Sequence, residues 1–233
     1  MKTILLDFDG TLLKMDVDKF TKSYFVALAN YFKADYDPKR LVEAVGKGTY
    51  AMIKNDGNLT NAQVFAQVFA QYFKADPNNE QFLKFYQTAF KLTKEACTID
   101  GDARMLIDIL KAKGYRLILA TNPLFPYEGT KQRMAFVGLS PDDFEMITTY
   151  EDCHYCKPNL AYYEEILAKI DEKAENCVMI GNDVDEDMVV QQLGMETILL
   201  TDCLINKSQK PLTFDRVCTI KQLIADLQAD RLI

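Results

Sequence analysis

Two acidic segments of this 233-residue chain follow directly on short apolar runs. Residues 7–11, Asp-Phe-Asp-Gly-Thr, come after the run 2–6, and residues 181–187, Gly-Asn-Asp-Val-Asp-Glu-Asp, come after the run 177–180. Carboxylates can hold Mg²⁺, which prefers hard oxygen ligands, and an aspartate can also attack phosphorus as a nucleophile. The two segments are therefore candidates for a metal site and for covalent phosphoryl chemistry.

The hydroxyl of Thr121 and the amine of Lys157 are candidates for binding a phosphate group. Thr121 and Asn122 follow the apolar run 116–120, and Lys157 stands just before a predicted helix at 159–170. Phosphoryl transfer needs positive and hydrogen-bonding groups placed in advance around the transferring group. Taken singly, an acidic turn is usually a helix cap or a solvated loop, so the prediction depends on all of these segments meeting at one place.

The surrounding elements predict how the segments would meet. From residue 100 onward, helical patterns alternate with short apolar runs. We expect strands at 2–6, 116–120, 145–149, 177–180 and 197–200, and helices at 102–113, around 131–136, and at 159–170, 186–193 and 220–227. This alternation is typical of an α/β fold with a doubly wound parallel sheet. Ligands bind outside the carboxyl ends of such strands, where the candidate segments would lie.

The segment of residues 16–97 differs from the rest, because it has helical spacing and no strand pattern. We expect four helices there, at 16–33, 38–54, 60–74 and 79–97. The chain is thus predicted to form an α/β domain of residues 1–14 and 98–233, with an inserted helical domain of residues 15–97.

This arrangement resembles the haloacid dehalogenase-like hydrolase superfamily over essentially the whole chain. The superfamily has four short motifs at the ends of defined elements, and each motif has a counterpart here. The counterparts are Asp7-x-Asp9-x-Thr11, Thr121 with its frequent companion Asn122, Lys157-Pro158, and Gly181-x-Asp183-x-x-x-Asp187. The resemblance implies a Rossmann-like core with a helical cap inserted after the first strand.

The resemblance also implies roles for the motif residues. Asp7 would attack phosphorus, and Asp9 would act as general acid and then as the base that activates water. Mg²⁺ would be held by Asp7, the backbone carbonyl of Asp9, and Asp183. Thr121 and Lys157 would bind the phosphate oxygens.

Two further motif residues would assist. Asn122 would add a substrate contact beside Thr121, and Asp187 would orient Lys157 or a water on the metal. The presence of Asp9 favours phosphoryl transfer over dehalogenation, because dehalogenases of the superfamily lack an acidic residue two positions after the nucleophile. We therefore predict a Mg²⁺-dependent phosphohydrolase that cleaves a small phosphorylated metabolite through an aspartyl-phosphate. A phosphomutase of the same superfamily and a catalytically idle binding protein are the alternatives.

Residues of the cap would choose the substrate. Gly46 and Gly48 would break a helix and could present Lys47 or Tyr50 to the site, although a plain turn between helices fits the same residues. Phe125, just beyond the second motif, is a candidate for the substrate entrance. The aromatic residues of the insert recur at helical spacing and are interpreted as core packing. They are Phe20, Tyr24, Phe25, Tyr31, Phe32, Phe65, Phe69, Tyr72 and Phe73.

Composition excludes several other classes of protein. The net charge is −7 with scattered Lys and Arg, which does not suit a nucleic-acid binder. Neither a signal peptide nor a membrane-spanning run is expected, and the six Cys without dense spacing indicate a reduced, cytoplasmic protein. His154 is the only histidine, so residues 153–156 (Cys-His-Tyr-Cys) are interpreted as a loop rather than a zinc site. For the oligomeric state, we expect either a monomer or a homodimer.

Overall fold

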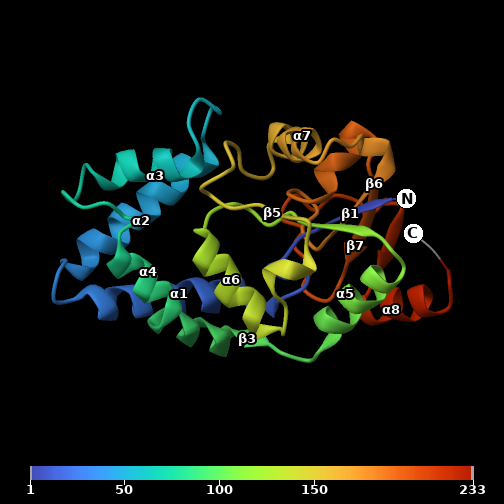
Figure 1. The fold of residues 1–233 in the computed structure, drawn as a ribbon, viewed down its shortest axis with the longest axis horizontal. Coiled ribbons are helices and arrows are strands. Elements are labelled where there is room, and N and C mark those ends of the chain that lie inside the picture. The colour runs from blue at the N-terminus through green and yellow to red at the C-terminus, as the bar shows by residue number, and fades with distance from the viewer. Residues whose placement is uncertain (1, 232–233) are drawn as a thin grey trace.

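A computed structural model describes residues 2–231 of the chain. Its main sheet has six parallel strands in the order β5-β4-β1-β6-β7-β8 (Figure 1). The strands are β1 (Thr3–Leu6), β4 (Arg116–Leu119), β5 (Met146–Ile147), β6 (Cys177–Gly181), β7 (Glu196–Leu200) and β8 (Arg216–Cys218). β1 lies between β4 and β6, so the chain crosses from one side of β1 to the other after β5. The strand order therefore reverses beside β1, which is where such sheets bind ligands.

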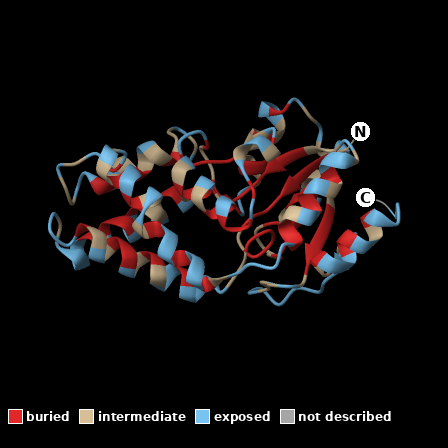
Figure 2. Cartoon of the chain, turned by 60° about the horizontal axis from the view of Figure 1, so that its bottom comes forward, coloured by how far each residue is buried: buried red, intermediate tan, exposed pale blue. Residues whose placement is uncertain are grey.

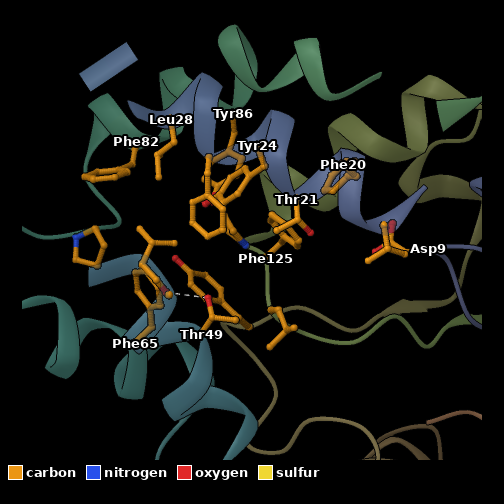
Figure 3. Close-up of a pocket in the computed structure, with 18 of the residues that line it drawn as sticks. Asp9, Phe20, Thr21, Tyr24, Leu28, Thr49, Phe65, Phe82, Tyr86 and Phe125 are labelled. Atoms are coloured by element: carbon orange, nitrogen blue, oxygen red, sulfur yellow. Dashed lines mark hydrogen bonds between the residues drawn. The ribbon is translucent and has the colours of Figure 1, made fainter. Parts of the chain in front are cut away.

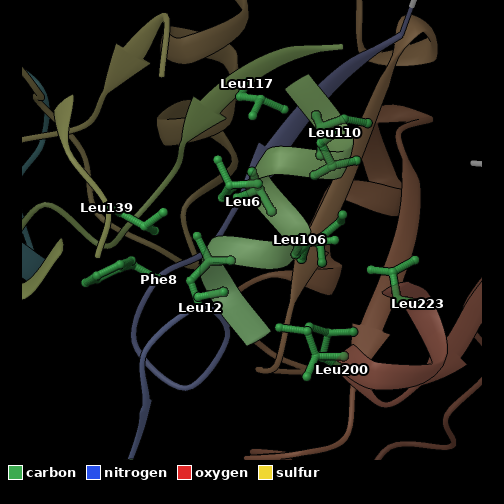
Figure 4. Close-up of a cluster of buried hydrophobic side chains, with 14 of the residues drawn as sticks. Leu6, Phe8, Leu12, Leu106, Leu110, Leu117, Leu139, Leu200 and Leu223 are labelled. Carbon is green, nitrogen blue, oxygen red and sulfur yellow. The ribbon is translucent and has the colours of Figure 1, made fainter. Parts of the chain in front are cut away.

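Helices cover both faces of this sheet, as the alternation of the sequence predicts. They are α5 (Asp102–Ala112), α6 (Tyr127–Phe136), α7 (Leu160–Lys169) and α8 (Ile220–Gln228), with short 3₁₀ helices η2 (Pro141–Asp143), η3 (Ala174–Asn176) and η4 (Met188–Leu193). Successive strand residues point to opposite faces. Leu6 is buried with Leu106 of α5 and Leu223 of α8 (Figure 4), whereas Leu5 is buried in a cluster with Tyr162 and Ile166 of α7. The predicted doubly wound α/β fold is confirmed.

The insert contains α1 (Val17–Phe32), α2 (Pro38–Ile53), α3 (Asn61–Phe69), α4 (Glu80–Gln87) and the 3₁₀ helix η1 (Ala89–Ala96). The four α-helices begin at residues whose side chains accept hydrogen bonds from the first-turn N–H groups, as is typical of helix caps. These residues are Asp16, Asp37, Thr60 and Asn79. The helices lie beside the carboxyl ends of the strands (Figure 1) and bury their apolar faces against one another (Figure 2).

A short two-stranded ribbon joins the insert to the sheet domain. β2 (Lys14–Met15) pairs antiparallel with β3 (Cys97–Thr98), so the two ends of the insert meet. The sequence did not predict this ribbon, because strands of two residues carry no periodic signal. It lies at the expected limits of the helical domain, although the division into two domains stays a prediction.

The start of α3 docks onto the sheet domain. The N–H of Asn61 donates to the carbonyl of Cys153 (2.8 Å), and the N–H of Ala62 donates to the carbonyl of Tyr150 (2.8 Å). The fully buried Asn61 side chain also donates to the carbonyl of Pro123 (3.4 Å). These bonds bring the insert against the loop that carries Thr121.

Several predicted elements have other bounds or another form. The helix expected at 79–97 is divided into α4 and η1 at Thr88, whose hydroxyl donates to the carbonyl of Lys84 (2.6 Å) and competes with regular helical bonding. The helix expected at 60–74 ends at Phe69, and the one at 186–193 is the shorter 3₁₀ helix η4. β8 was not predicted. Among the helices of residues 2–231, none has the length and apolar character to cross a bilayer.

The expectation of a helix break at Gly46 and Gly48 is wrong, because α2 runs through both. A Cβ on Gly48 would come within 2.6 Å of the ring of Phe65 in α3, so this glycine allows the two helices to approach closely. A Cβ on Gly46 would meet no atom within 4 Å. Gly46 therefore borders open space, whereas Gly48 forms a packing contact between α2 and α3.

We predict opposite effects of alanine at these two glycines. Gly48→Ala should lower the free energy of unfolding by about 1–3 kcal/mol, because the ring of Phe65 must shift. Gly46→Ala, the matched control, should raise it by up to about 1 kcal/mol through helix propensity alone. Urea denaturation followed by circular dichroism measures both, and equal stabilisation by the two substitutions would contradict the packing.

Candidate active site

The buried ammonium group of Lys157 connects two of the predicted acidic segments. Its Nζ donates to Oδ1 of Asp7 at 2.8 Å and to Oδ1 of Asp187 at 2.6 Å. The three residues are 2%, 7% and 1% exposed. Burial opposes the charge of Lys157, but the carboxylates of Asp187 and Asp7 raise its pKa well above the ordinary value. Lys157 is therefore a fixed positive charge beside Asp7.

Asp7 is held by its neighbours on β1 and β6. Its N–H donates to the carbonyl of Ile180 (2.9 Å), which continues the strand pairing by one residue. The hydroxyl of Thr11 donates to Oδ2 of Asp7 (2.7 Å) and also lies 2.9 Å from Oδ1 of Asn182. Both carboxylate oxygens of Asp7 thus have a fixed direction, which suits a nucleophile.

The loop after β6 is built around the carboxylate of Asp187. Its Oδ2 accepts hydrogen bonds from the N–H groups of Asn182 (3.0 Å) and Asp183 (2.9 Å). A Cβ at Gly181 would lie 2.3 Å from that oxygen, so only glycine permits the approach. Oδ1 of Asp183 in turn accepts from the N–H groups of Asp185 (2.8 Å) and Glu186 (2.9 Å). The loop therefore has one defined conformation.

Two side chains after β4 carry buried polar atoms without a protein partner. The carbonyl of Thr121 accepts from the hydroxyls of Tyr162 (2.8 Å) and Thr148 (2.7 Å), which fixes the backbone there. Oγ1 of Thr121 and Oδ1 of Asn122 are buried and form no hydrogen bond. The amide nitrogen of Asn122 donates to Glu186 (3.1 Å). An unpaired buried polar atom is costly, so such atoms indicate a site that a ligand completes.

Arg133 of α6, which the sequence analysis missed, binds the carboxylate of Asp9. The arginine is fully buried, and its Nη1 donates to Oδ2 of Asp9. Nη2 donates to the hydroxyl of Thr130 (3.2 Å), and the guanidinium lies 4.5 Å from the ring centre of Phe125 and 5.5 Å from that of Phe8. Arg133 stands among other polar residues of α6, so neither charge nor spacing marks it in the sequence.

The carboxylate of Asp9 combines a paired oxygen with a free one. Burial raises the pKa of Asp9, and the charge of Arg133 acts in the opposite direction. Oδ1 of Asp9 is buried without a hydrogen-bond partner. An acidic group with a raised pKa and one unpaired oxygen suits proton transfer.

A cavity of about 330 Å³ extends from Asp9 into the helical insert. Figure 3 shows Asp9 at one end and Phe82 and Phe65 at the other. Phe125, the candidate for the substrate entrance, lines this cavity. The interpretation of the insert aromatics as core packing is confirmed, because all nine lie in one apolar cluster, and four of them also line the cavity. These are Phe20, Tyr24, Phe25 and Phe65.

Lys47, the candidate substrate contact in the insert, is exposed and does not line this cavity. The residues of α2 that do line it are Val45, Gly46 and Thr49. Because α2 is continuous, residues 45, 46 and 49 share one side of the helix, whereas residue 47 is rotated away from them. A role for Lys47 in this cavity is therefore not supported.

Within residues 2–231, no three side chains of His, Cys, Asp or Glu are arranged so that they could hold a metal ion together. The predicted magnesium set is smaller, with the carboxylates of Asp7 and Asp183 and the carbonyl of Asp9. Mg²⁺ keeps several waters and takes one or two carboxylates plus substrate phosphate, so the donor set fits this ion. His154 is instead bound to Glu165, with its Nδ1 2.8 Å from Oε1.

Comparison with known proteins identifies the family. The model of the haloacid dehalogenase-like hydrolases matches residues 1–189, and the chain belongs to this family. The predicted resemblance is confirmed, as is the prediction that the protein is an enzyme. The roles of individual residues stay predictions.

Relatives with this fold include phosphatases. The chain is 20% identical to the pyrophosphatase PpaX of Bacillus mycoides over 207 residues, 86% of this chain and 84% of that protein. It is 35% identical to a glyceraldehyde 3-phosphate phosphatase of Methanothermobacter thermautotrophicus over 97 residues, 41% of each chain. The crystal structure of a HAD phosphatase from Thermococcus onnurineus superposes with a TM-score of 0.61 at 16% identity, with full coverage of both chains.

We predict that Arg133 is a major source of stability only while Asp9 is charged. Arg133→Leu should lower the free energy of unfolding by about 1–3 kcal/mol, because it leaves the half-buried carboxylate of Asp9 without its cation. Adding Asp9→Asn should recover much of this loss. Urea denaturation of both variants at one pH provides the comparison, and an unchanged stability in Arg133→Leu would contradict the assignment.

Proposed function

We propose that this enzyme is a Mg²⁺-dependent phosphatase that hydrolyses a small phosphorylated metabolite through an aspartyl-phosphate on Asp7. The observation that carries the proposal is the contact of the buried Lys157 ammonium with Asp7 (2.8 Å). A permanent positive charge at the nucleophile stabilises the negative charge of the transferring group without reorganisation. The phosphatases among the relatives support the same reaction.

In the first half of the reaction, a carboxylate oxygen of Asp7 attacks phosphorus and forms a P–O bond. The ester P–O bond breaks, its electron pair stays on the alcohol oxygen, and Asp9 donates a proton to that oxygen. The unpaired Oδ1 of Asp9 and its raised pKa support this role. The products of this half are the free alcohol and phosphorylated Asp7.

In the second half, water attacks phosphorus of the aspartyl-phosphate while Asp9 takes its proton. The bond between phosphorus and Asp7 breaks, and the carboxylate and inorganic phosphate are released. The unpaired hydroxyl of Thr121 and the ammonium of Lys157 would bind the phosphate oxygens in both halves, with Asn122 beside them. Asp187 holds Lys157 in place through the 2.6 Å bond.

Asp7, Asp183 and the carbonyl of Asp9 would hold Mg²⁺. When bound, the ion would offset the negative charge of the site and polarise the phosphoryl group. The need for it follows from the charges, because Asp7 and Asp187 both contact Lys157, which supplies one positive charge, and Asp183 would add a further carboxylate beside a dianionic phosphate.

The helical insert would act as a cap, so that the proposed cap domain comprises residues 15–97 and the core domain residues 1–14 and 98–233. The cavity between the two parts begins at Asp9, which supports a cap that selects the alcohol part of the substrate. We place the enzyme in the cytoplasm as a monomer or homodimer acting on a free metabolite. The net charge of −7 supports a partner other than nucleic acid.

We predict that Asp7→Asn abolishes hydrolysis. Release of inorganic phosphate from 4-nitrophenyl phosphate with Mg²⁺ should fall by at least about 10³-fold, since the amide is no nucleophile. Thr11→Val, which keeps the carboxylate but removes its hydrogen bond, should retain measurable activity. Wild-type rates in Asp7→Asn would rule out the proposed nucleophile. A requirement for a bisphosphate activator, with no free phosphate, would favour the phosphomutase.

We predict that substitution of Asp183 weakens the binding of Mg²⁺, whereas substitution of Lys157 weakens the binding of the phosphate group. Asp183→Ala should raise the Mg²⁺ concentration needed for half-maximal activity by at least about tenfold, since a charged ligand is lost. Lys157→Met, whose side chain is similar in length, should lower kcat/KM by about 10²–10³-fold with little change in that Mg²⁺ concentration. Circular dichroism checks that both variants fold. An equal shift in Mg²⁺ dependence in the two variants would contradict the separate roles.

A further inference from the structure

The wall of the 330 Å³ cavity between the insert and Asp9 is predominantly apolar. Among the described residues that line it, Asp9 alone carries a charge, and no Lys, Arg or His is present. Most of the others are aromatic or aliphatic, including Phe20, Phe65, Phe82 and Phe125 (Figure 3). A second phosphate or a carboxylate on the substrate would lose its water here without gaining a cation, which is strongly unfavourable.

The hydroxyl groups of the wall are mostly bound to other protein atoms. The hydroxyls of Tyr24 and Tyr86 lie 3.4 Å apart, the hydroxyl of Tyr150 donates to Asn78, and that of Thr49 donates to the carbonyl of Val45. Burial raises the pKa of Tyr24 to about 12, so this group stays neutral. A sugar with several hydroxyls would find few partners and would leave its own polar groups unpaired.

The position of the cavity assigns it to the leaving alcohol. Asp9 is the residue proposed to donate a proton to the alcohol oxygen, and it is also the end wall of the cavity. An alcohol whose oxygen meets Asp9 would therefore extend its carbon skeleton along Phe20 and Phe125, whose rings pack edge to face and line the cavity. The volume is ample, because an apolar cavity of about 150 Å³ already holds one benzene molecule.

We infer that the substrate is a phosphate monoester of an apolar, uncharged alcohol, either aromatic or with a chain of several methylene groups. This inference rests on the proposed phosphatase function and adds the class of leaving group. It sets this enzyme apart from relatives named for pyrophosphate or glyceraldehyde 3-phosphate, whose leaving groups are charged or polar.

The experiment compares kcat/KM along the n-alkyl phosphates from ethyl to hexyl, with glycerol 3-phosphate and pyrophosphate as polar substrates. The alkoxides of the series differ little in basicity, so differences along it report binding of the chain. Each methylene group that leaves water completely is worth up to about fourfold, and we expect a rise of at least tenfold from ethyl to hexyl phosphate. Both polar substrates should be slower than hexyl phosphate.

Position 46 provides a matched pair of variants. Gly46 lines the cavity, and a Cβ there meets open space, so Gly46→Leu should fill part of the volume and Gly46→Ala should not. Gly46→Leu should lower kcat/KM for hexyl phosphate by a larger factor than kcat/KM for ethyl phosphate, so that most of the gain from ethyl to hexyl is lost. Gly46→Ala should keep the gain.

The outcomes separate the two proposals. The proposal of an apolar leaving group would be overturned if phosphate were released fastest from glycerol 3-phosphate or pyrophosphate, or if the rate did not change with chain length. Either result would still support the proposed phosphatase function. A full chain-length gain in Gly46→Leu would overturn the assignment of this cavity. Release from none of the esters would overturn the phosphatase and the inference with it.

Discussion

The pairing of Lys157 with Asp7 and Asp187 is the interaction on which the arrangement of the site depends. Each of the three side chains comes from a different part of the chain, and each would be costly to bury alone. Together they fix the ends of β1 and β6 and the turn before α7 relative to one another. Asp187 also binds the backbone of its own loop, so the conformation of residues 181–187 and the position of the ammonium are set by the same carboxylate.

Asp9 lies at the boundary between two environments of opposite character. On one side are the carboxylates and the ammonium group, which suit a phosphate and a metal ion. On the other side is the aromatic cavity of the insert. Arg133 holds Asp9 at this boundary from the core and itself packs on Phe125, a wall of the cavity. The residue proposed to transfer the proton would thus lie beside both the reacting group and the part of the substrate that the proposed cap would recognise.

The sequence predicted five of the six strands of the main sheet and the meeting of Asp7 with Lys157 and Asp187, because short apolar runs followed by polar turns place side chains at one edge of a parallel sheet. It failed where the determinant is a contact between distant segments. Arg133 is one polar residue of α6 until the fold brings Asp9 against it. Helical spacing identified Phe20 and Phe65 as inward-facing, but whether an inward-facing ring packs or borders a cavity depends on its neighbours. The same holds for Gly48, which permits contact between α2 and α3 instead of breaking a helix.

The central claim is that Asp7 becomes phosphorylated, and trapping that species tests it most directly. An aryl phosphate loses its aryl oxide without help from an acid, so in Asp9→Asn the first half of the reaction proceeds while the attack of water is slowed. Acid quenching, proteolysis and mass spectrometry of this variant should locate a phosphoryl group on the peptide that contains Asp7. A phosphoryl group on another residue, or none while the wild type turns over the same ester, would contradict the account.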